Sequence, residues 1–135
     1  MTSKKLVARS DYLLPQSLEG LHIQSREWLD TIAFWKDETR FFSHLLQKRE
    51  AEINDPLNFP KILGDLDTLH ETLFDYLADE IRDHERLLSR VEGGAPGLSD
   101  SDYREQHRQL AGKMEVFSAD FREFKRMVFG YARKW

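Results

Sequence analysis

Hydrophobic residues recur every three or four positions in three stretches of the chain, which is the spacing of one face of an α-helix. The stretches cover residues 17–54, 58–92 and 99–135, and nothing between them has the alternating pattern of a strand. Numbering the middle stretch by sevens gives two adjacent rows, which we expect to face the other helices: Leu66, Leu73, Glu80 and Leu87, beside Leu63, His70, Leu77, His84 and Val91. The middle helix is therefore expected to contact both of the others.

Turn-forming residues separate the stretches. The residue before a proline is disfavoured in a helix, so Pro56 places the end of the first helix near Asn54. Asn58 is then the expected N-cap of the second helix. Gly93 and Gly94 suit the left-handed conformation that often follows the end of a helix.

Short connections between long helices favour antiparallel neighbours. We therefore expect an all-α fold, an antiparallel up-down-up bundle of three long helices that forms a single domain from residue 17 to 135. Residues 1–16 lack sustained periodicity and form a short N-terminal arm, which we expect to pack across one end of the bundle. Gly112 and Gly130, inside the third stretch, mark either a close helix approach or a tolerated weakness of ~1 kcal/mol each.

The amino-acid composition excludes several kinds of partner and site. The 135 residues have 40% hydrophobic and 33% charged side chains, which is enough to close and cover one core. A net charge of -4 provides no positive field for a phosphate backbone, so we expect no nucleic acid partner. The absence of cysteine excludes disulfides and thiolate metal sites. No apolar run approaches the ~20 residues of a membrane helix or forms a signal-peptide core, so we expect no membrane partner and a cytoplasmic location.

Aromatic residues are more frequent than two core rows require, with nine Phe, four Tyr and three Trp. They either fill the third face of a monomer core or form a patch for a homodimer around Phe34, Phe41 and Phe124. Because two-fold oligomers are common, we expect a homo-oligomer or a protein partner.

Two histidines should lie at one height in the bundle. His84 is nine residues before Gly93, and His107 is nine residues after Leu98. Glu80 precedes His84 by one helical turn. Two imidazoles and a carboxylate from different helices are typical ligands of Zn, or of Fe or Mn, inside a helical bundle. His84, His107 and Glu80 are thus candidate metal ligands, and Glu27 is a candidate from the first helix.

A structural role is the other interpretation of the same residues. Glu80 would pair with His84 or with an arginine such as Arg108, and the histidines would form hydrogen bonds that fix the register of the helices. We expect His70 to pack against aromatic rings, and His22 and His44 to be exposed or at the rim of the core.

One further pattern concerns the first helix, which carries Trp28-Leu29, then Phe34-Trp35-Lys36-Asp37-Glu38, Phe41-Phe42 and Leu45-Leu46. This arrangement resembles small uncharacterised bacterial proteins that form helical bundles. The resemblance covers the first helix only, and it implies a long-helix fold and no particular activity.

Catalytic signatures are missing from the sequence: it has no phosphate-binding glycine loop, nucleophile elbow or HExxH motif. We therefore expect a non-enzymatic helical bundle that acts through self-association or a protein partner. The alternative is a metal-binding bundle that uses the seam histidines and Glu80.

Overall fold

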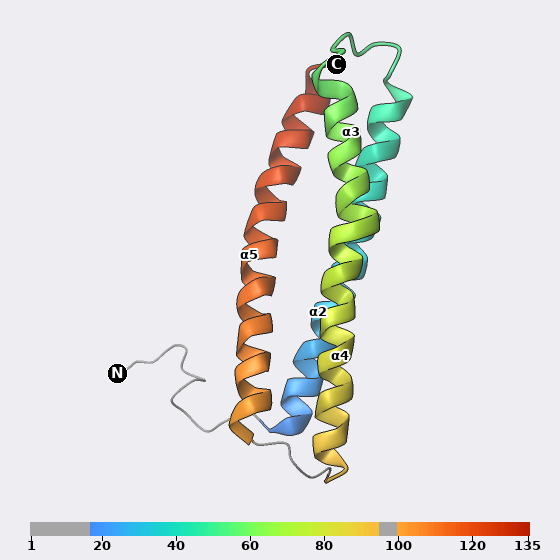
Figure 1. The fold of residues 1–135 in the computed structure, drawn as a ribbon. Coiled ribbons are helices and arrows are strands. Elements are labelled where there is room, and N and C mark those ends of the chain that lie inside the picture. The colour runs from blue at the N-terminus through green and yellow to red at the C-terminus, as the bar shows by residue number, and fades with distance from the viewer. Residues whose placement is uncertain (1–16, 95–99) are drawn as a thin grey trace, which may run out of the picture.

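The computed structural model describes residues 17–94 and 100–135, and these residues are helical apart from short turns. The elements are α2 (Leu18–Lys48), α3 (Asn58–Thr68), a π-helical turn η1 (Leu69–Leu73), α4 (Phe74–Glu92) and α5 (Asp100–Arg133). Figure 1 shows α3, η1 and α4 as one continuous rod with α2 and α5 beside it. The all-α prediction is confirmed, since no strand occurs in the described ranges. The proposed arm, residues 1–16, lies outside them.

Helix α2 begins at a side-chain cap and ends earlier than predicted. The Ser17 hydroxyl accepts a hydrogen bond of 3.0 Å from the backbone N–H of Gly20. The helix stops at Lys48, before the predicted end near Asn54. Arg49 then donates a 2.9 Å hydrogen bond to the carbonyl of Ala132 at the end of α5. The turn after α2 is therefore hydrogen-bonded to the C-terminal end of α5.

Asp55, rather than Asn58, caps the middle rod. Asn58 is the first residue of α3, and its backbone N–H donates to the Asp55 carboxylate at 3.2 Å. The Tyr131 hydroxyl donates to the same carboxylate at 3.1 Å. Asp55 is preferred because its side chain can accept from α3 and α5 together. At the other end of the rod, Gly94 adopts the expected left-handed conformation with φ of 78°.

The π turn η1 changes which residues of the rod face the core. The buried Phe74 lies eight positions after the buried Leu66, whereas two α-helical turns span about seven. A π turn adds one residue to a helix and so rotates everything after it. Phe74 therefore takes the core position that sevenfold numbering assigns to Leu73, and Leu73 is 38% exposed. The predicted row of Leu66, Leu73, Glu80 and Leu87 is therefore right at the buried Leu66 and wrong after the π turn, where Leu73 is exposed and Glu80 only partly buried.

Three rings from three helices form the centre of the core. Trp35 of α2 lies 5.5 Å from Phe74 and 5.6 Å from Phe121 of α5, measured between ring centroids. Phe74 and Phe121 meet edge to face at 5.2 Å. Rings in this geometry stabilise a core by ~1 kcal/mol per pair beyond the area that they bury. The cluster joins all three helices at the level of the π turn.

The interior glycines of α5 do not mark close helix approaches. A Cβ atom added at Gly112 or at Gly130 would have no neighbour within 4 Å. The second interpretation of these glycines, a tolerated weakness of the helix, is the correct one.

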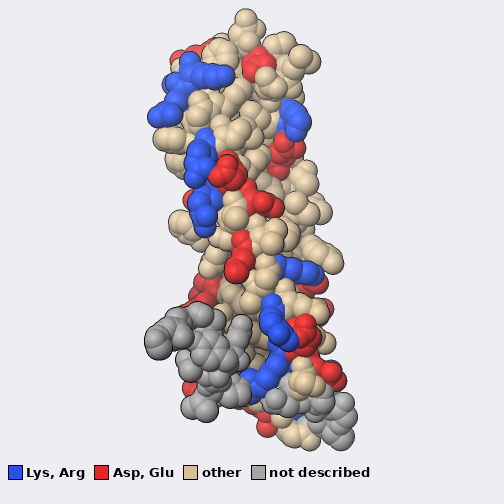
Figure 2. Space-filling view, turned by 90° about the vertical axis from the view of Figure 1, so that its left-hand side faces the viewer, with Lys and Arg blue, Asp and Glu red and all other residues tan. Residues whose placement is uncertain are grey.

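The surface on the α5 side has charged side chains of both signs separated by wide uncharged areas (Figure 2). None of the described helices combines the length and the apolar character that crossing a membrane requires.

Candidate functional site

The two histidines expected at one height meet in the structure. His84 extends from α4 and His107 from α5, and Nε2 of His84 lies 2.9 Å from Nδ1 of His107. Both are buried, with 3% and 6% of their surface exposed. Counting along the helices from the turn between them therefore predicted this contact correctly, because each helix rises regularly over these residues.

Gln24 of α2 extends this contact into a chain of hydrogen bonds across three helices. Its Oε1 lies 2.7 Å from Nε2 of His107. An amide oxygen only accepts, so His107 carries its proton on Nε2, and its Nδ1 accepts from the Nε2–H of His84. Donors and acceptors thus follow one another in a fixed order from α4 through α5 to α2.

Burial keeps both imidazoles neutral. The Trp28 ring stacks on His107 with the ring centroids 4.7 Å apart and 28° between their planes. Burial lowers the pKa of His107 to about 4, and the neighbouring His84 and Arg104 side chains contribute to the shift. Burial also lowers the pKa of His84, against the opposing effects of Gln106 and Glu85. A proton on either ring would place a charge in a poorly solvated position beside a second imidazole.

Glu80 does not join the histidines. Its two carboxylate oxygens accept from Nζ of Lys113 on α5 at 3.0 and 2.9 Å. The expected partners, His84 and Arg108, are therefore both wrong, and Arg108 pairs with Glu105 on its own helix. Glu80 lies at the rim of the seam, where its side chain is 30% exposed, whereas His84, one turn along the same helix, is buried against His107.

Of the proposed metal ligands, His84 and His107 are brought together, and neither Glu80 nor Glu27 joins them. The ring nitrogens through which His84 and His107 face each other are occupied by their mutual hydrogen bond. Gln24 approaches His107 where a carboxylate was expected, and Glu27 is exposed. Within residues 17–94 and 100–135, no three His, Cys, Asp or Glu side chains are placed to hold a metal ion. The geometry fits a hydrogen-bonded seam better than a metal centre.

His22, which we expected to be exposed or at the rim of the core, is buried and forms a second polar contact beside this network. It is 7% exposed, and its Nδ1 lies 2.5 Å from the Glu85 carboxylate of α4. Its Nε2 lies 3.0 Å from Glu92, one heptad further along α4. A signal for its burial is present in the sequence, because His22 continues the three-and-four spacing that runs through Ser25 and Trp28. His44 is exposed, as expected.

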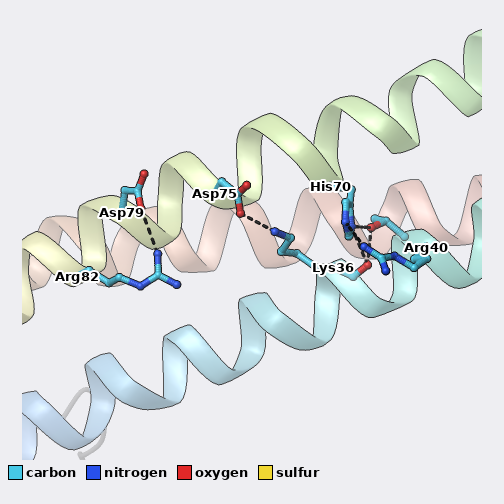
Figure 3. Close-up of polar contacts among 7 residues, drawn as sticks. Lys36, Arg40, His70, Asp75, Asp79 and Arg82 are labelled. Atoms are coloured by element: carbon cyan, nitrogen blue, oxygen red, sulfur yellow. Dashed lines mark hydrogen bonds and ion pairs between the residues drawn. The ribbon is translucent and has the colours of Figure 1, made fainter.

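His70 lies in the π turn, where polar groups of α2 hold its ring (Figure 3). Nδ1 lies 3.1 Å from the carbonyl oxygen of Lys36, and Nε2 lies 2.9 Å from Nη2 of Arg40. A carbonyl accepts and a guanidinium donates, so Nδ1 carries the proton. The Lys36 ammonium pairs with Asp75, just beyond the turn, at 2.6 Å. His70 therefore faces α2 backbone and charge rather than the aromatic rings that we expected.

Fold and site together define an all-α protein whose helices are joined by a buried neutral histidine network. Comparisons with family models, with characterised proteins and with solved structures found no match.

Proposed function

We propose that the protein is a non-enzymatic helical bundle that acts by self-association, with the outer face of α2 as its contact surface. The observation that carries this proposal is the exposure of Phe34 and Phe41. Each is 62% exposed, and they are seven residues apart and so share one face of α2. Ile23, three turns earlier on that face, is 47% exposed. These side chains present ~300 Å² of apolar surface, a size typical of interaction sites.

We propose that the bundle consists of three long helices in the up-down-up arrangement. Support comes from contacts between α2 and α4: His22 meets Glu85, whereas Lys36 meets Asp75. Residue numbers thus rise along one helix as they fall along the other. In such a bundle the outer face of α2 remains accessible to a second copy.

A two-fold pairing of α2 with α2 suits the positions of these side chains. In an antiparallel pair with its axis between Asp37 and Glu38, Phe34 lies opposite the partner's Phe41. Glu27 then lies opposite the partner's Lys48, which pairs opposite charges at both ends. A shallow hollow beside Phe41, lined by His44, Leu45 and Lys48 among others, would receive the partner's Phe34. The contact is self-complementary, as a two-fold interface must be.

Charge near the axis limits the affinity. Asp37 and Glu38 of both copies approach one another there, although Lys125 of α5 pairs with Glu38 at 3.0 Å. Screening by salt weakens such repulsion.

Molar mass in solution tests the proposal. The chain has a mass of 16.0 kDa, so sedimentation equilibrium should give about twice that value for the wild type. Replacing Phe34 and Phe41 together by serine should return the mass to that of a monomer, with an unchanged helical circular dichroism spectrum.

A matched control uses exposed apolar residues on the other helices. Tyr76 and Val116 are each 60% exposed and lie on α4 and α5. Replacing this pair by serine should leave the dimer intact. A wild-type protein that stays monomeric at millimolar concentration, or a dimer broken by the control pair instead, would contradict the proposal.

A further inference from the structure

A groove of about 380 Å³ lies between the π turn and the middle of α5. Leu69 and Leu73 form one wall, and Phe117 and Phe124 of α5 form the other. Leu73 lines this groove because the π turn has rotated it out of the core. Because π turns are frequent at functional sites in proteins, the groove beside this π turn is a candidate binding site.

The floor of the groove is aromatic and buried. Phe74 and Phe121 lie there, 0% and 4% exposed, and the Trp35 ring packs behind both. Nζ of Lys125 lies 5.0 Å from the centroid of the Phe121 ring, while the same ammonium pairs with Glu38. One cation is thus already attracted to this ring, as expected of an aromatic face.

The charged residues of the rim are acidic. Asp65 of α3 and Asp120 of α5 stand on opposite sides, and among the described residues that line the groove none is basic. Asp65 is compensated by Lys61 at 2.9 Å. Asp120 forms no ion pair with any residue in the described ranges, so its charge is available to a ligand.

We propose that this groove binds a small organic cation, an amine with an apolar body of about the size of a phenylalkyl group. The body would fill the space between the leucine and phenylalanine walls, and the ammonium would lie toward Asp120. The groove's volume is within the range of small-molecule sites, ~300 to 1,000 Å³. A helix of a partner needs a longer trough than the two turns of each helix that line this groove. This site is separate from the outer face of α2, so it does not depend on the proposed self-association.

Three probes of one shape test the charge preference: 4-phenylbutylamine, 4-phenylbutanol and 4-phenylbutyrate. Each is titrated into ¹⁵N-labelled protein, and amide shifts are followed by NMR. We expect saturable shifts at the groove walls, with a dissociation constant for the amine of ~0.1 to 1 mM, given its few heavy atoms. The amine should bind roughly threefold to tenfold more tightly than the carboxylate, with the alcohol between them.

Two variants and a control locate the site. Asp120→Asn should reduce the preference for the amine over the carboxylate to less than about twofold and leave the alcohol unchanged. Phe117→Ala should weaken all three probes, because it removes one wall. Asp79→Asn removes an exposed acid of α4 that pairs with Arg82, outside the groove, and should change nothing.

Several results would overturn the inference. The amine and the carboxylate could bind equally, or the preference for the amine could persist in Asp120→Asn. The amide shifts could be confined to another surface, or no saturable shift could occur at 10 mM amine, a concentration roughly tenfold above the weakest dissociation constant expected. Groove amides that shift with protein concentration alone would show a second copy in the groove, which also excludes the small cation.

Discussion

Lowering the pH from 7.5 to 5 should destabilise the fold through the buried imidazole of His107. Its pKa is lowered to about 4 in the native protein, against 6.5 for a free imidazole. At a pH between these values the unfolded chain binds a proton at His107 that the native protein does not bind, so the free energy of unfolding falls as the pH falls. Above pH 6.5 both states are neutral at this position, and the effect disappears.

The magnitude follows from the two pKa values. A shift of this size corresponds to ~3 kcal/mol once the pH lies below both values, and to ~2 kcal/mol at pH 5. The lowered pKa of His84 acts in the same direction. Most carboxylates are still ionised at pH 5, so the histidines dominate the change in this range.

Urea unfolding followed by circular dichroism at the two pH values measures this loss. We expect the midpoint to move down with little change in slope, since the surface exposed on unfolding is the same. His107→Gln keeps hydrogen-bonding capacity without the titrating ring, and it should remove more than half of the pH dependence. His44→Gln, a change at an exposed histidine, should retain all of it. Equal stability at both pH values, or full pH dependence in His107→Gln, would refute this account of the network.

Three other tests, which use five changes, probe the packing by thermal or urea unfolding. Gly112→Ala meets no neighbour and should raise stability by up to ~1 kcal/mol, or the melting temperature by ~3 to 5 °C; an unchanged or lower value contradicts the open environment. Phe74→Ala should cost ~3 to 5 kcal/mol and Leu73→Ala less than ~1 kcal/mol, and the reverse order would refute the register shift. Deleting the exposed Glu71 removes the extra residue of the π turn and should cost less than ~2 kcal/mol, whereas deleting Asp79 rotates the core face of α4 away and should unfold the protein.

The helical class and the meeting of His84 with His107 were predictable because they depend on local signals. Helical spacing is repeated over many residues, and the position of a residue along a helix follows from its distance to the turn. The end of α2 was less predictable. The hydrogen bond from Arg49 to the Ala132 carbonyl joins residues 83 positions apart, and no pattern near Arg49 indicates it.

The π turn could not be predicted from the hydrophobic pattern. With a regular helix the core row passes through Leu73, and with the π turn it passes through Phe74, and both residues are apolar. Leu73 and Phe74 are adjacent, so a core row can pass through either without a break in hydrophobicity. The pairing of Glu80 with Lys113 was missed for another reason, because Glu80 lies one turn from His84 on the same helix and this spacing does not show that its carboxylate turns toward Lys113 at the rim. Gln24 was missed for a chemical reason, since an amide is a poor metal ligand but a good acceptor for an imidazole N–H.

The attachment of α5 has a consequence for the order of folding. Its hydrogen bonds to α2, donated by His107 to Gln24 and by Lys125 to Glu38, join residues 83 and 87 positions apart. Contacts between α2 and the middle rod, such as Lys36 with Asp75, span 39 positions. Closing a shorter loop costs less conformational entropy. Contacts between the middle rod and α5 span fewer positions still, 23 for His84 with His107 and 33 for Glu80 with Lys113. We therefore expect each outer helix to pack first against the middle rod, and the direct contacts between α2 and α5 to form last and open first.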